Sequence, residues 1–532
     1  MACLTRSIVA LAVTSRDSER SSSGTLEASQ VWYARADRRL LLVAIAGILA
    51  TIPVWVAIYP PMVDLPQHAA QIALLRNLRD PAFRFADLFW VTWFTPYLLG
   101  YLAIYALTPL LGIVSAAKLV ISLALIGIPV STALLMRETG ADLYWALLTI
   151  PPIYGFSYTW GFVNFIVAAP LGLLFLVLVM RQARRPTLQM SLWLGMLAVL
   201  LFFSHALICI FILVVACSYV AMETGNLWKT MRLLAPIAVA FPIMLLWYLK
   251  TKSEPLAQQA VIWDLGWMSS PNTLSMGGRI TGFFTRLLGL EPRPLCIILG
   301  APLFILPFLA GARPIKRLAV WVPLAICVST LLFAPAGILL AWAIAYRFTI
   351  FVLPFFVIGL RQSGLARPLW RAATALLLLA WLVISTSKVV RYNDEARSFN
   401  RILSNMAPNQ RVLSLMFIPD SAFFPAPVFL HYPAWYSATK LGVVDMNFAL
   451  WPIEPVRYRP ARTPPIEIGF EWHPQAFRWT ESGGDSYRYF VVHAEGDVGG
   501  IVFAGAPCPI NLKIQEGNWL LYERDLSCPV VQ

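Results

Sequence analysis

The sequence predicts an α-helical membrane protein that crosses the bilayer about eleven times and ends in a small external α/β domain. Of its 532 residues, 59% are hydrophobic and only 13% are charged, a balance that soluble proteins of this size seldom have. Apolar runs of about 18 or more residues recur as far as Lys388, and the composition becomes mixed beyond that point. These two observations together give the fold class.

The first apolar run covers 40–58, and further runs follow as far as residue 388. Each is long enough to cross a hydrocarbon core about 30 Å thick, except that 142–158 is short and 188–222 is long. The later runs are 97–114, 116–136, 142–158, 161–180, 188–222, 231–249, 295–311, 318–338, 344–361 and 370–388.

Basic residues give the expected orientation. Arg35, Arg38 and Arg39 stand directly before the first run, and Lys and Arg gather on the cytoplasmic side of membrane proteins. We therefore expect a multi-pass protein of a cell inner membrane, with a cytoplasmic N-terminus and a periplasmic C-terminal domain. The same rule accounts for the net charge of +14, so nucleic acid is not an expected partner.

One part of this topology stays open. A simple count leaves Arg137 and the basic cluster at 181–185 outside, against the rule. The conflict disappears if 188–222 splits at Ser204-His205 into two short helices while 97–114 enters the membrane without crossing it. Both versions keep the loop after the first run and the C-terminal domain external.

The expected domains follow from these runs. Residues 1–38 are polar and rich in serine, which predicts a disordered cytoplasmic tail. Residues 39–390 form the transmembrane domain, with external loops at 59–96 and 250–294. Residues 391–532 form the external α/β domain.

The external domain has recognisable elements. Its start has apolar positions at helical spacing, then a turn at Pro408-Asn409 and a short strand. The segments YRYFVVHAEG and GNWLLYERD are typical of strands bounded by turn residues. In an oxidising compartment, Cys508 and Cys528 are candidates for a disulfide.

The stretch YPPMVDLPQHAAQ follows the first apolar run. Pro66 suits the first turn of a helix, and apolar positions after it predict a helix lying on the membrane surface. Asp64 stands at its entrance, and His68 follows one turn later, so the two side chains can share a face. Asp64 is a candidate general base, although aspartate at this position is also a good helix cap.

A second candidate is Arg347, in the late segment AYRFTIFVLPFFVIGL. A charged residue near the end of a membrane span is costly unless it has a partner. Guanidinium binds phosphate through two parallel hydrogen bonds, so a lipid-linked phosphate would suit it. The alternative is an arginine whose side chain extends to the membrane surface.

These features together resemble the GT-C superfamily of glycosyltransferases, and the layout is most similar to protein O-mannosyltransferases and lipid A aminoarabinose transferases. The resemblance rests on the external Asp64 loop, about eleven spans, the Arg347 segment and an external C-terminal domain. It implies an inverting enzyme that takes a sugar from a polyprenyl phosphate donor held in a lipid membrane. Asp64 would activate an acceptor, whose identity the sequence leaves unknown, and His68 would orient the carboxylate or that acceptor.

The resemblance implies further donor-binding residues. His205 lies within an apolar run, where imidazole more often bonds to the backbone of a neighbouring helix. In the family, the long external loop covers the donor site, and here that loop contributes Asp264 and Arg279. All three are candidates for contact with the donor.

No cofactor is expected besides the donor substrate. No GxGxxG, P-loop or HExxH pattern stands where it would be structurally meaningful. Some family members use a divalent metal, but one confident acidic residue supplies no ligand set. The alternative function is a multi-span transporter or flippase for a lipid-linked or small solute, and a scaffold for an envelope partner is a third possibility.

Overall fold

In the computed structural model, the residues with a described structure are 38–252, 275–338, 341–362, 367–525 and 527. The chain divides into two compact units, Met1–Leu42 and Val43–Gln532. The expected tail before residue 38, Asp264 and Cys528 lie outside the described residues, so the predictions made for them stay predictions.

Within the described part, six helices are long and apolar enough to cross a membrane. This supports a helical membrane protein but does not confirm eleven crossings. The six are Arg38–Val56, Leu98–Thr139 (α5), Val163–Arg184 (α7), Ala206–Thr224 (α9), Leu227–Thr251 and Pro368–Ser404 (α18). Shorter apolar helices are Leu188–Ser204 (α8), Arg293–Leu309 (α14) and Leu318–Phe333.

Three predicted runs have a different structure from the one expected. Residues 142–158 do not form one helix; they make short 3-10 and helical turns. Pro151 and Pro152 remove two backbone donors in succession, which prevents a continuous helix. The runs 97–114 and 116–136 are joined in α5, where Gly112 leaves the helical conformation with φ 73°.

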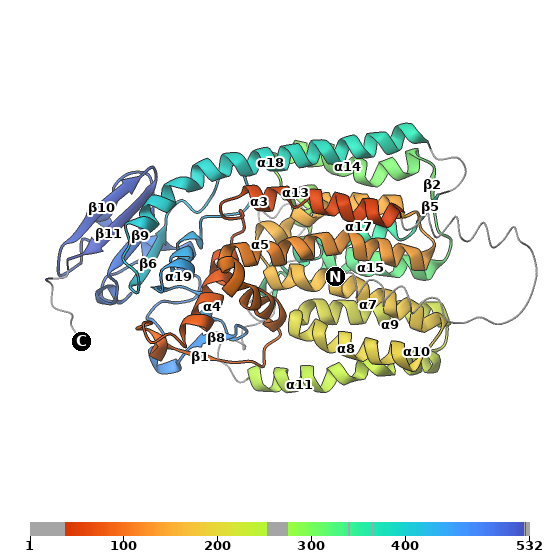
Figure 1. Ribbon diagram of the computed structural model, residues 1–532, viewed down its shortest axis with the longest axis horizontal. Helices are drawn as coiled ribbons and strands as arrows, with labels where there is room; N and C mark the ends of the chain where they lie inside the picture. The colour runs from red at the N-terminus through yellow and green to blue at the C-terminus, as the bar shows by residue number, and fades with distance from the viewer. Residues whose placement is uncertain (1–37, 253–274, 339–340, 363–366, 526, 528–532) are drawn as a thin grey trace, which may run out of the picture. The chain divides into compact units, whose positions relative to one another are not determined.

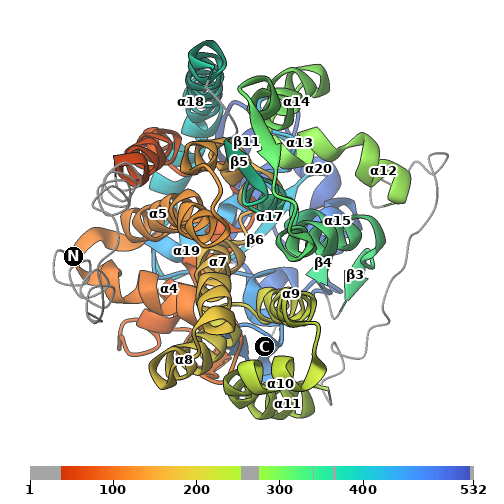
Figure 2. The same ribbon diagram turned by 90° about the vertical axis from the view of Figure 1, so that its right-hand side faces the viewer.

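The long run 188–222 divides at His205. This division was required by the topology in which 188–222 forms two short helices. His205 has extended backbone angles, φ −167° and ψ 112°, and separates α8 from α9. Figure 2, which looks along the helices, has α7 beside α5, α8 and α9. The split therefore yields two separately packed helices.

A five-stranded sheet follows α18, in the order β10-β11-β9-β6-β7. β6 runs parallel to β7 and β9, whereas β11 is antiparallel to β9 and β10. The three strands expected from the sequence are confirmed. The bounds are Arg411–Met416 (β6), Val443–Val444 (β7), Tyr489–His493 (β9), Ile510–Glu516 (β10) and Trp519–Arg524 (β11).

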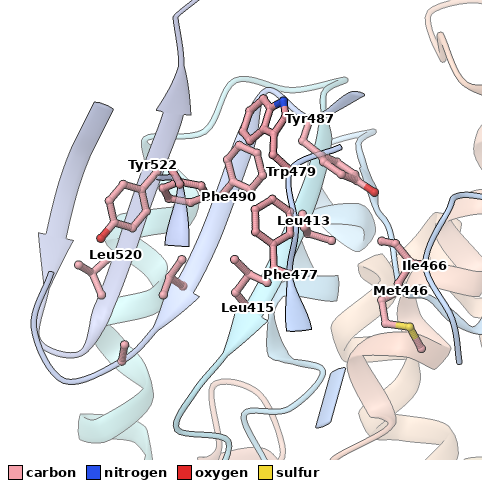
Figure 3. Packing of buried hydrophobic residues seen from close by; sticks show 13 residues of the cluster. Leu413, Leu415, Met446, Ile466, Phe477, Trp479, Tyr487, Phe490, Leu520 and Tyr522 are labelled. Atoms are coloured by element: carbon pink, nitrogen blue, oxygen red, sulfur yellow. The ribbon is translucent and has the colours of Figure 1, made fainter. Parts of the chain in front are cut away.

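The two faces of the sheet have separate cores because side chains alternate along each strand. Phe490 and Val492 of β9 pack into an aromatic cluster with Phe477 and Trp479 (Figure 3). On the opposite face, Trp519 contacts Phe399 of α18, with ring centroids 4.9 Å apart. The end of α18 is thus fixed to the sheet (Figure 1).

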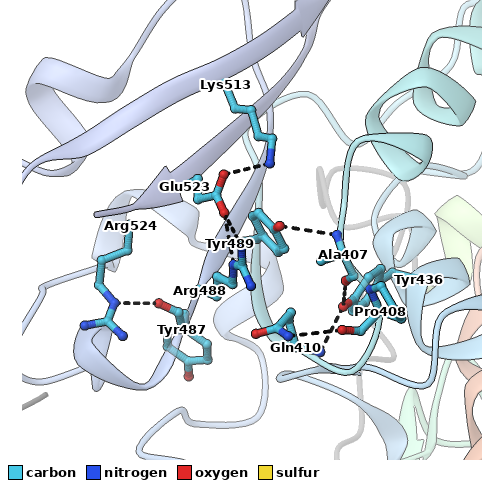
Figure 4. A network of polar contacts seen from close by, with 10 residues as sticks. All are labelled: Ala407, Pro408, Gln410, Tyr436, Tyr487, Arg488, Tyr489, Lys513, Glu523 and Arg524. Carbon is cyan, nitrogen blue, oxygen red and sulfur yellow. Dashed lines mark hydrogen bonds and ion pairs between the residues drawn. The ribbon is translucent and has the colours of Figure 1, made fainter. Parts of the chain in front are cut away.

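Two tyrosines hold the predicted turn between α18 and β6 (Figure 4). The Tyr436 hydroxyl donates to the Ala407 carbonyl at 2.7 Å and accepts from the Gln410 N–H at 3.0 Å. The Ala407 N–H donates to the Tyr489 hydroxyl at 3.2 Å. Asn409 adopts a left-handed conformation, φ 58°, which asparagine tolerates in turns.

The remaining elements matter for the site. β1 (Phe89–Val91), in the loop 59–96, pairs with β8 (Val456–Tyr458), antiparallel, so this loop is joined to the C-terminal region. Other helices are α3 (Ile52–Val56), α4 (Leu65–Asn77), α6 (Phe156–Thr159), α10 (Leu227–Leu234), α11 (Ala240–Thr251), α12 (Met276–Thr281), α13 (Phe283–Leu288), α15 (Val322–Phe333), α16 (Ile344–Arg347), α17 (Thr349–Val357), α19 (Trp435–Thr439) and α20 (Gly499–Val502).

Candidate active site

Helix α4, which follows Asp64, is not the surface helix that the sequence predicts. Its residues from Leu65 to Leu75 are all buried, against α5, α19 and neighbouring turns. Gln67 donates to the Met446 carbonyl at 3.0 Å and accepts from the Phe448 N–H at 3.2 Å. These hydrogen bonds attach the loop 59–96 to the C-terminal region.

Asp64 stands at the N-cap position, but its side chain makes no capping bond, so the helix-cap explanation is wrong. Its backbone N–H donates instead to the Trp160 carbonyl at 3.0 Å. Gly161 lies so close that a Cβ there would come within 2.7 Å of the Asp64 nitrogen, and its φ is +79°. The Trp160-Gly161 turn therefore fixes the position of Asp64 and leaves its carboxylate available.

The partner of that carboxylate is His431, 367 residues later in the chain. Nδ1 of His431 lies 3.1 Å from Oδ1 of Asp64. The two side chains are only 8% and 12% exposed, respectively. A carboxylate oxygen accepts a hydrogen bond, so Nδ1 is the donor in this contact. Nε2 is buried and has no hydrogen-bond partner in the described part of the chain.

His68 makes a different contact from the one expected. Its Nδ1 lies 2.5 Å from the Tyr101 hydroxyl, which donates to Oε2 of Glu454 at 2.6 Å. His68 thus begins a buried chain of three residues, and His431 takes the place beside the Asp64 carboxylate. The hydrogen bond of His68 goes to Tyr101 and not to the Asp64 carboxylate, although the charge of Asp64 acts on the His68 ring.

Burial changes the pKa values of two residues in this chain, His68 and Glu454. It lowers the pKa of His68 to about 4, against the attraction of Asp64. It also raises the pKa of Glu454 to about 8; the hydrogen bond from Tyr101 opposes this rise and the Asp64 charge adds to it. At neutral pH His68 is therefore uncharged and Glu454 is mostly protonated, so neither group adds a net charge beside Asp64.

Arg347, at the end of α16, is buried on the other side of the site. Its Nε and Nη2 donate to the Trp342 carbonyl at 3.2 and 3.0 Å, and its Cζ lies 3.6 Å from the ring centroid of Phe162. It has no carboxylate within 4.0 Å among the described residues, although the charge of Asp64 acts on it. A buried cation without an ion pair is costly, and an anionic ligand would offset that cost.

His205 lies near Arg347 through Tyr97. Tyr97 interacts electrostatically with Arg347, and its ring centroid lies 4.8 Å from that of His205. Both ring nitrogens of His205 are buried without a partner in the described part, as are both amide atoms of Asn164. The structure thus brings Asp64, Arg347 and His205 into one neighbourhood, as their predicted roles require.

Arg279 does not join this group. It is 4% exposed and donates to carbonyl oxygens at the C-terminal end of α15, at 3.0 Å from Leu332 and 2.6 Å from Ala334. These bonds satisfy backbone groups at the helix end. Its donor-binding role, like that of Asp264, stays a prediction.

No family model matches this chain. A search of curated proteins finds no match either. The GT-C resemblance therefore rests on the layout and on the site residues themselves. Within the described part, no group of three His, Cys, Asp or Glu side chains is arranged to hold a metal ion.

Sequence reasoning missed His431, Glu454, Tyr97 and Tyr101. His431 opens the stretch HYPAWYSATKLGVVD in the C-terminal region, and no motif marks this histidine. A histidine beside an aromatic, apolar stretch was the available signal, because such a ring is buried and needs a partner. The other three gave no local signal, since their roles depend on contacts between distant segments.

Proposed function

We propose that this protein is a GT-C-like glycosyltransferase, which moves a sugar from a polyprenyl phosphate to an acceptor at the external face of the membrane. One observation carries the proposal: a buried carboxylate, Asp64, and a buried guanidinium without an ion pair, Arg347, contact neighbouring residues of one turn. The Asp64 N–H donates to the Trp160 carbonyl, and the Arg347 guanidinium lies 3.6 Å from the centroid of the Phe162 ring. Sugar transfer from a lipid phosphate needs a base for the acceptor and a cation for the phosphate.

The reaction is a direct displacement. Asp64 takes the proton from the acceptor hydroxyl, and the acceptor oxygen forms a bond to the anomeric carbon of the sugar. The bond from that carbon to the phosphate oxygen breaks, and its electron pair leaves with the lipid phosphate. Arg347 stabilises the charge that develops there, and attack from the opposite face inverts the anomeric configuration.

The neighbouring residues support these two roles. Tyr97 interacts electrostatically with Arg347 and packs on His205, whose ring nitrogens have no partner in the described part of the chain. His431 holds the carboxylate of Asp64 through Nδ1. The proposal includes about eleven crossings of an inner membrane, with a cytoplasmic N-terminus and a periplasmic C-terminal domain. The basic residues before the first run support this orientation, because Lys and Arg gather on the cytoplasmic side.

The test is the Asp64→Asn variant, with Asp80→Asn as its control. Asparagine keeps the size and loses the base, so transfer of radiolabelled sugar from polyprenyl phosphate to envelope fractions should fall about 10²- to 10⁴-fold. Binding of the donor should persist. Asp80 lies in the same external loop but is exposed, and its variant should transfer at the wild-type rate. Normal transfer by the Asp64→Asn protein would exclude Asp64 as the base.

A further inference from the structure

The backbone on both sides of Glu454 is attached to the loop 59–96. The Ile453 carbonyl accepts a hydrogen bond from the Thr95 hydroxyl. The Pro455 carbonyl accepts from the Thr92 N–H at 2.8 Å. These two bonds fix the place from which the Glu454 side chain extends out of the C-terminal region.

The Glu454 carboxyl group joins two helices. Its Oε2 accepts from the Tyr101 hydroxyl of α5 at 2.6 Å, and this hydroxyl lies 2.5 Å from Nδ1 of His68 in α4. All three side chains are at most 3% exposed. The Phe448 ring packs edge to face against the His68 ring, with centroids 5.3 Å apart. Each member of the His68–Tyr101–Glu454 chain is therefore held in place by its neighbours.

This chain ends one helical turn from Asp64. The His68 N–H donates to the Asp64 carbonyl at 3.0 Å, which closes the first turn of α4. The charge of Asp64 also acts on the His68 ring and on Glu454. A shift of His68 thus moves the turn that carries Asp64, and a displacement of about 1 Å at a reacting group can cost on the order of 10²-fold in rate.

The surroundings of Glu454 favour its uncharged form. The titratable groups that act on it are Tyr101 and Tyr97 of α5 and Asp64 before α4. Among the described residues, no Lys, Arg or His nitrogen lies within 4.0 Å of its carboxyl group. A negative charge on Glu454 would oppose the Asp64 carboxylate and an anionic donor phosphate, with no ion pair to offset it.

We propose that Glu454 is a positioning residue for sugar transfer, which holds Tyr101 and His68 and through them the first turn of α4 that carries Asp64. Glu454 acts in its uncharged form, so transfer falls when this carboxyl group ionises. The inference rests on the proposed function and adds to it a residue supplied by the C-terminal region.

The first experiment compares sugar transfer by the full chain in lipid nanodiscs at pH 7 and pH 9. Wild-type kcat/KM should fall about tenfold, because a carboxyl group with a pKa of about 8 loses most of its protons over this range. Glu454→Gln stays uncharged and keeps an oxygen that accepts from Tyr101, so its kcat/KM should be the same at both pH values. Glu481→Gln removes an exposed carboxyl group and should show the wild-type fall.

Two further variants separate positioning from folding. Glu454→Leu and Tyr101→Phe remove the hydrogen bonds and keep most of the buried volume, so kcat at pH 7 should fall at least tenfold while thermal unfolding shows a folded protein. Glu454→Gln should retain kcat at this pH. Wild-type kcat in both Glu454→Leu and Tyr101→Phe, or an alkaline fall in Glu454→Gln equal to that of the wild type, would overturn the inference.

The second experiment needs no sugar transfer. The protein has five histidines, so solid-state NMR of ¹⁵N-histidine-labelled protein can identify the His68 signals by comparison with His68→Asn. His68 has a pKa of about 4 and stays neutral from pH 7 to pH 9, so a change in its ¹⁵N shifts over this range comes from the groups bonded to it. We expect this change in the wild type and not in Glu454→Gln. No change in the wild type, or the same change in both proteins, would contradict the inference.

The two experiments separate this inference from the proposed function. Protein that shows the His68 change but transfers no sugar at any pH would refute the glycosyltransferase and leave the coupling of Glu454 to His68 standing. Protein that transfers sugar equally well at pH 7 and pH 9, without a change at His68, would retain the proposed function and refute the positioning role.

Discussion

At the scale of residues, the candidate site combines residues that stand out in the sequence with residues that come together only in the fold. Asp64, Arg347 and His205 were found because a charged or polar residue beside an apolar run is conspicuous. His431 could not be paired with Asp64, since 367 residues separate them and spacing reports only local neighbours. The same limit hid Glu454, which meets His68 only through Tyr101.

Glu454 should make the stability of the protein depend on pH. Burial raises its pKa from 4.5 to about 8, so the folded state keeps a proton that the unfolded state releases in this range. Stability therefore falls as pH rises from about 4.5 to about 8. The Glu454→Gln variant has no carboxyl group to titrate at this position. The melting temperature of the variant minus that of the wild type should therefore be larger at pH 9 than at pH 5.

The comparison uses thermal unfolding of the purified protein in one detergent at both pH values. Glu481→Gln removes an exposed carboxyl and should melt as the wild type does at each pH. An equal difference between Glu454→Gln and wild type at pH 5 and pH 9 would show that Glu454 does not hold its proton as described.

At the scale of elements, α4 shows how a sequence can predict a helix correctly and its surroundings wrongly. Its spacing predicted a helix with one apolar face, and the helix is present. Gln67 and Gln71 are buried, and each amide makes two hydrogen bonds to backbone groups of the C-terminal region. Amide side chains can satisfy buried backbone groups as well as water does, and a sequence pattern does not distinguish the two.

Gly161 gives a prediction at this scale. Gly161→Ala adds a Cβ that would lie 2.7 Å from the backbone nitrogen of Asp64, at φ +79°, so the Asp64 loop must shift. A displacement of about 1 Å at a reacting group can cost on the order of 10²-fold in rate. We expect sugar transfer by this variant to fall at least tenfold.

Gly140→Ala is the matched control for that substitution. Gly140 ends α5 with φ +77°, almost the same backbone strain, but a Cβ there meets no atom within 4 Å. Its variant should lose some thermal stability and keep the transfer rate. If both variants lost activity equally, the strain alone, and not the contact with Asp64, would be responsible.

At the scale of the whole molecule, hydropathy predicted the class better than the number of crossings. A window of apolar residues measures length, but it does not register the Pro151-Pro152 break or the extended His205. The strands of the C-terminal sheet were predicted because their alternation and turns are local. The boundary at residue 390 stays a prediction, and α18, Pro368–Ser404, runs through it without a break.

The central claim is that Arg347 and Asp64 face the two substrates of one transfer reaction. A cryo-EM structure of the full chain in nanodiscs with polyprenyl phosphate tests it directly. The account predicts phosphate density within hydrogen-bonding distance of Arg347 and on the side of the site that faces Asp64. Phosphate density bound at another place, with the Arg347 guanidinium still on the Trp342 carbonyl alone, would contradict it.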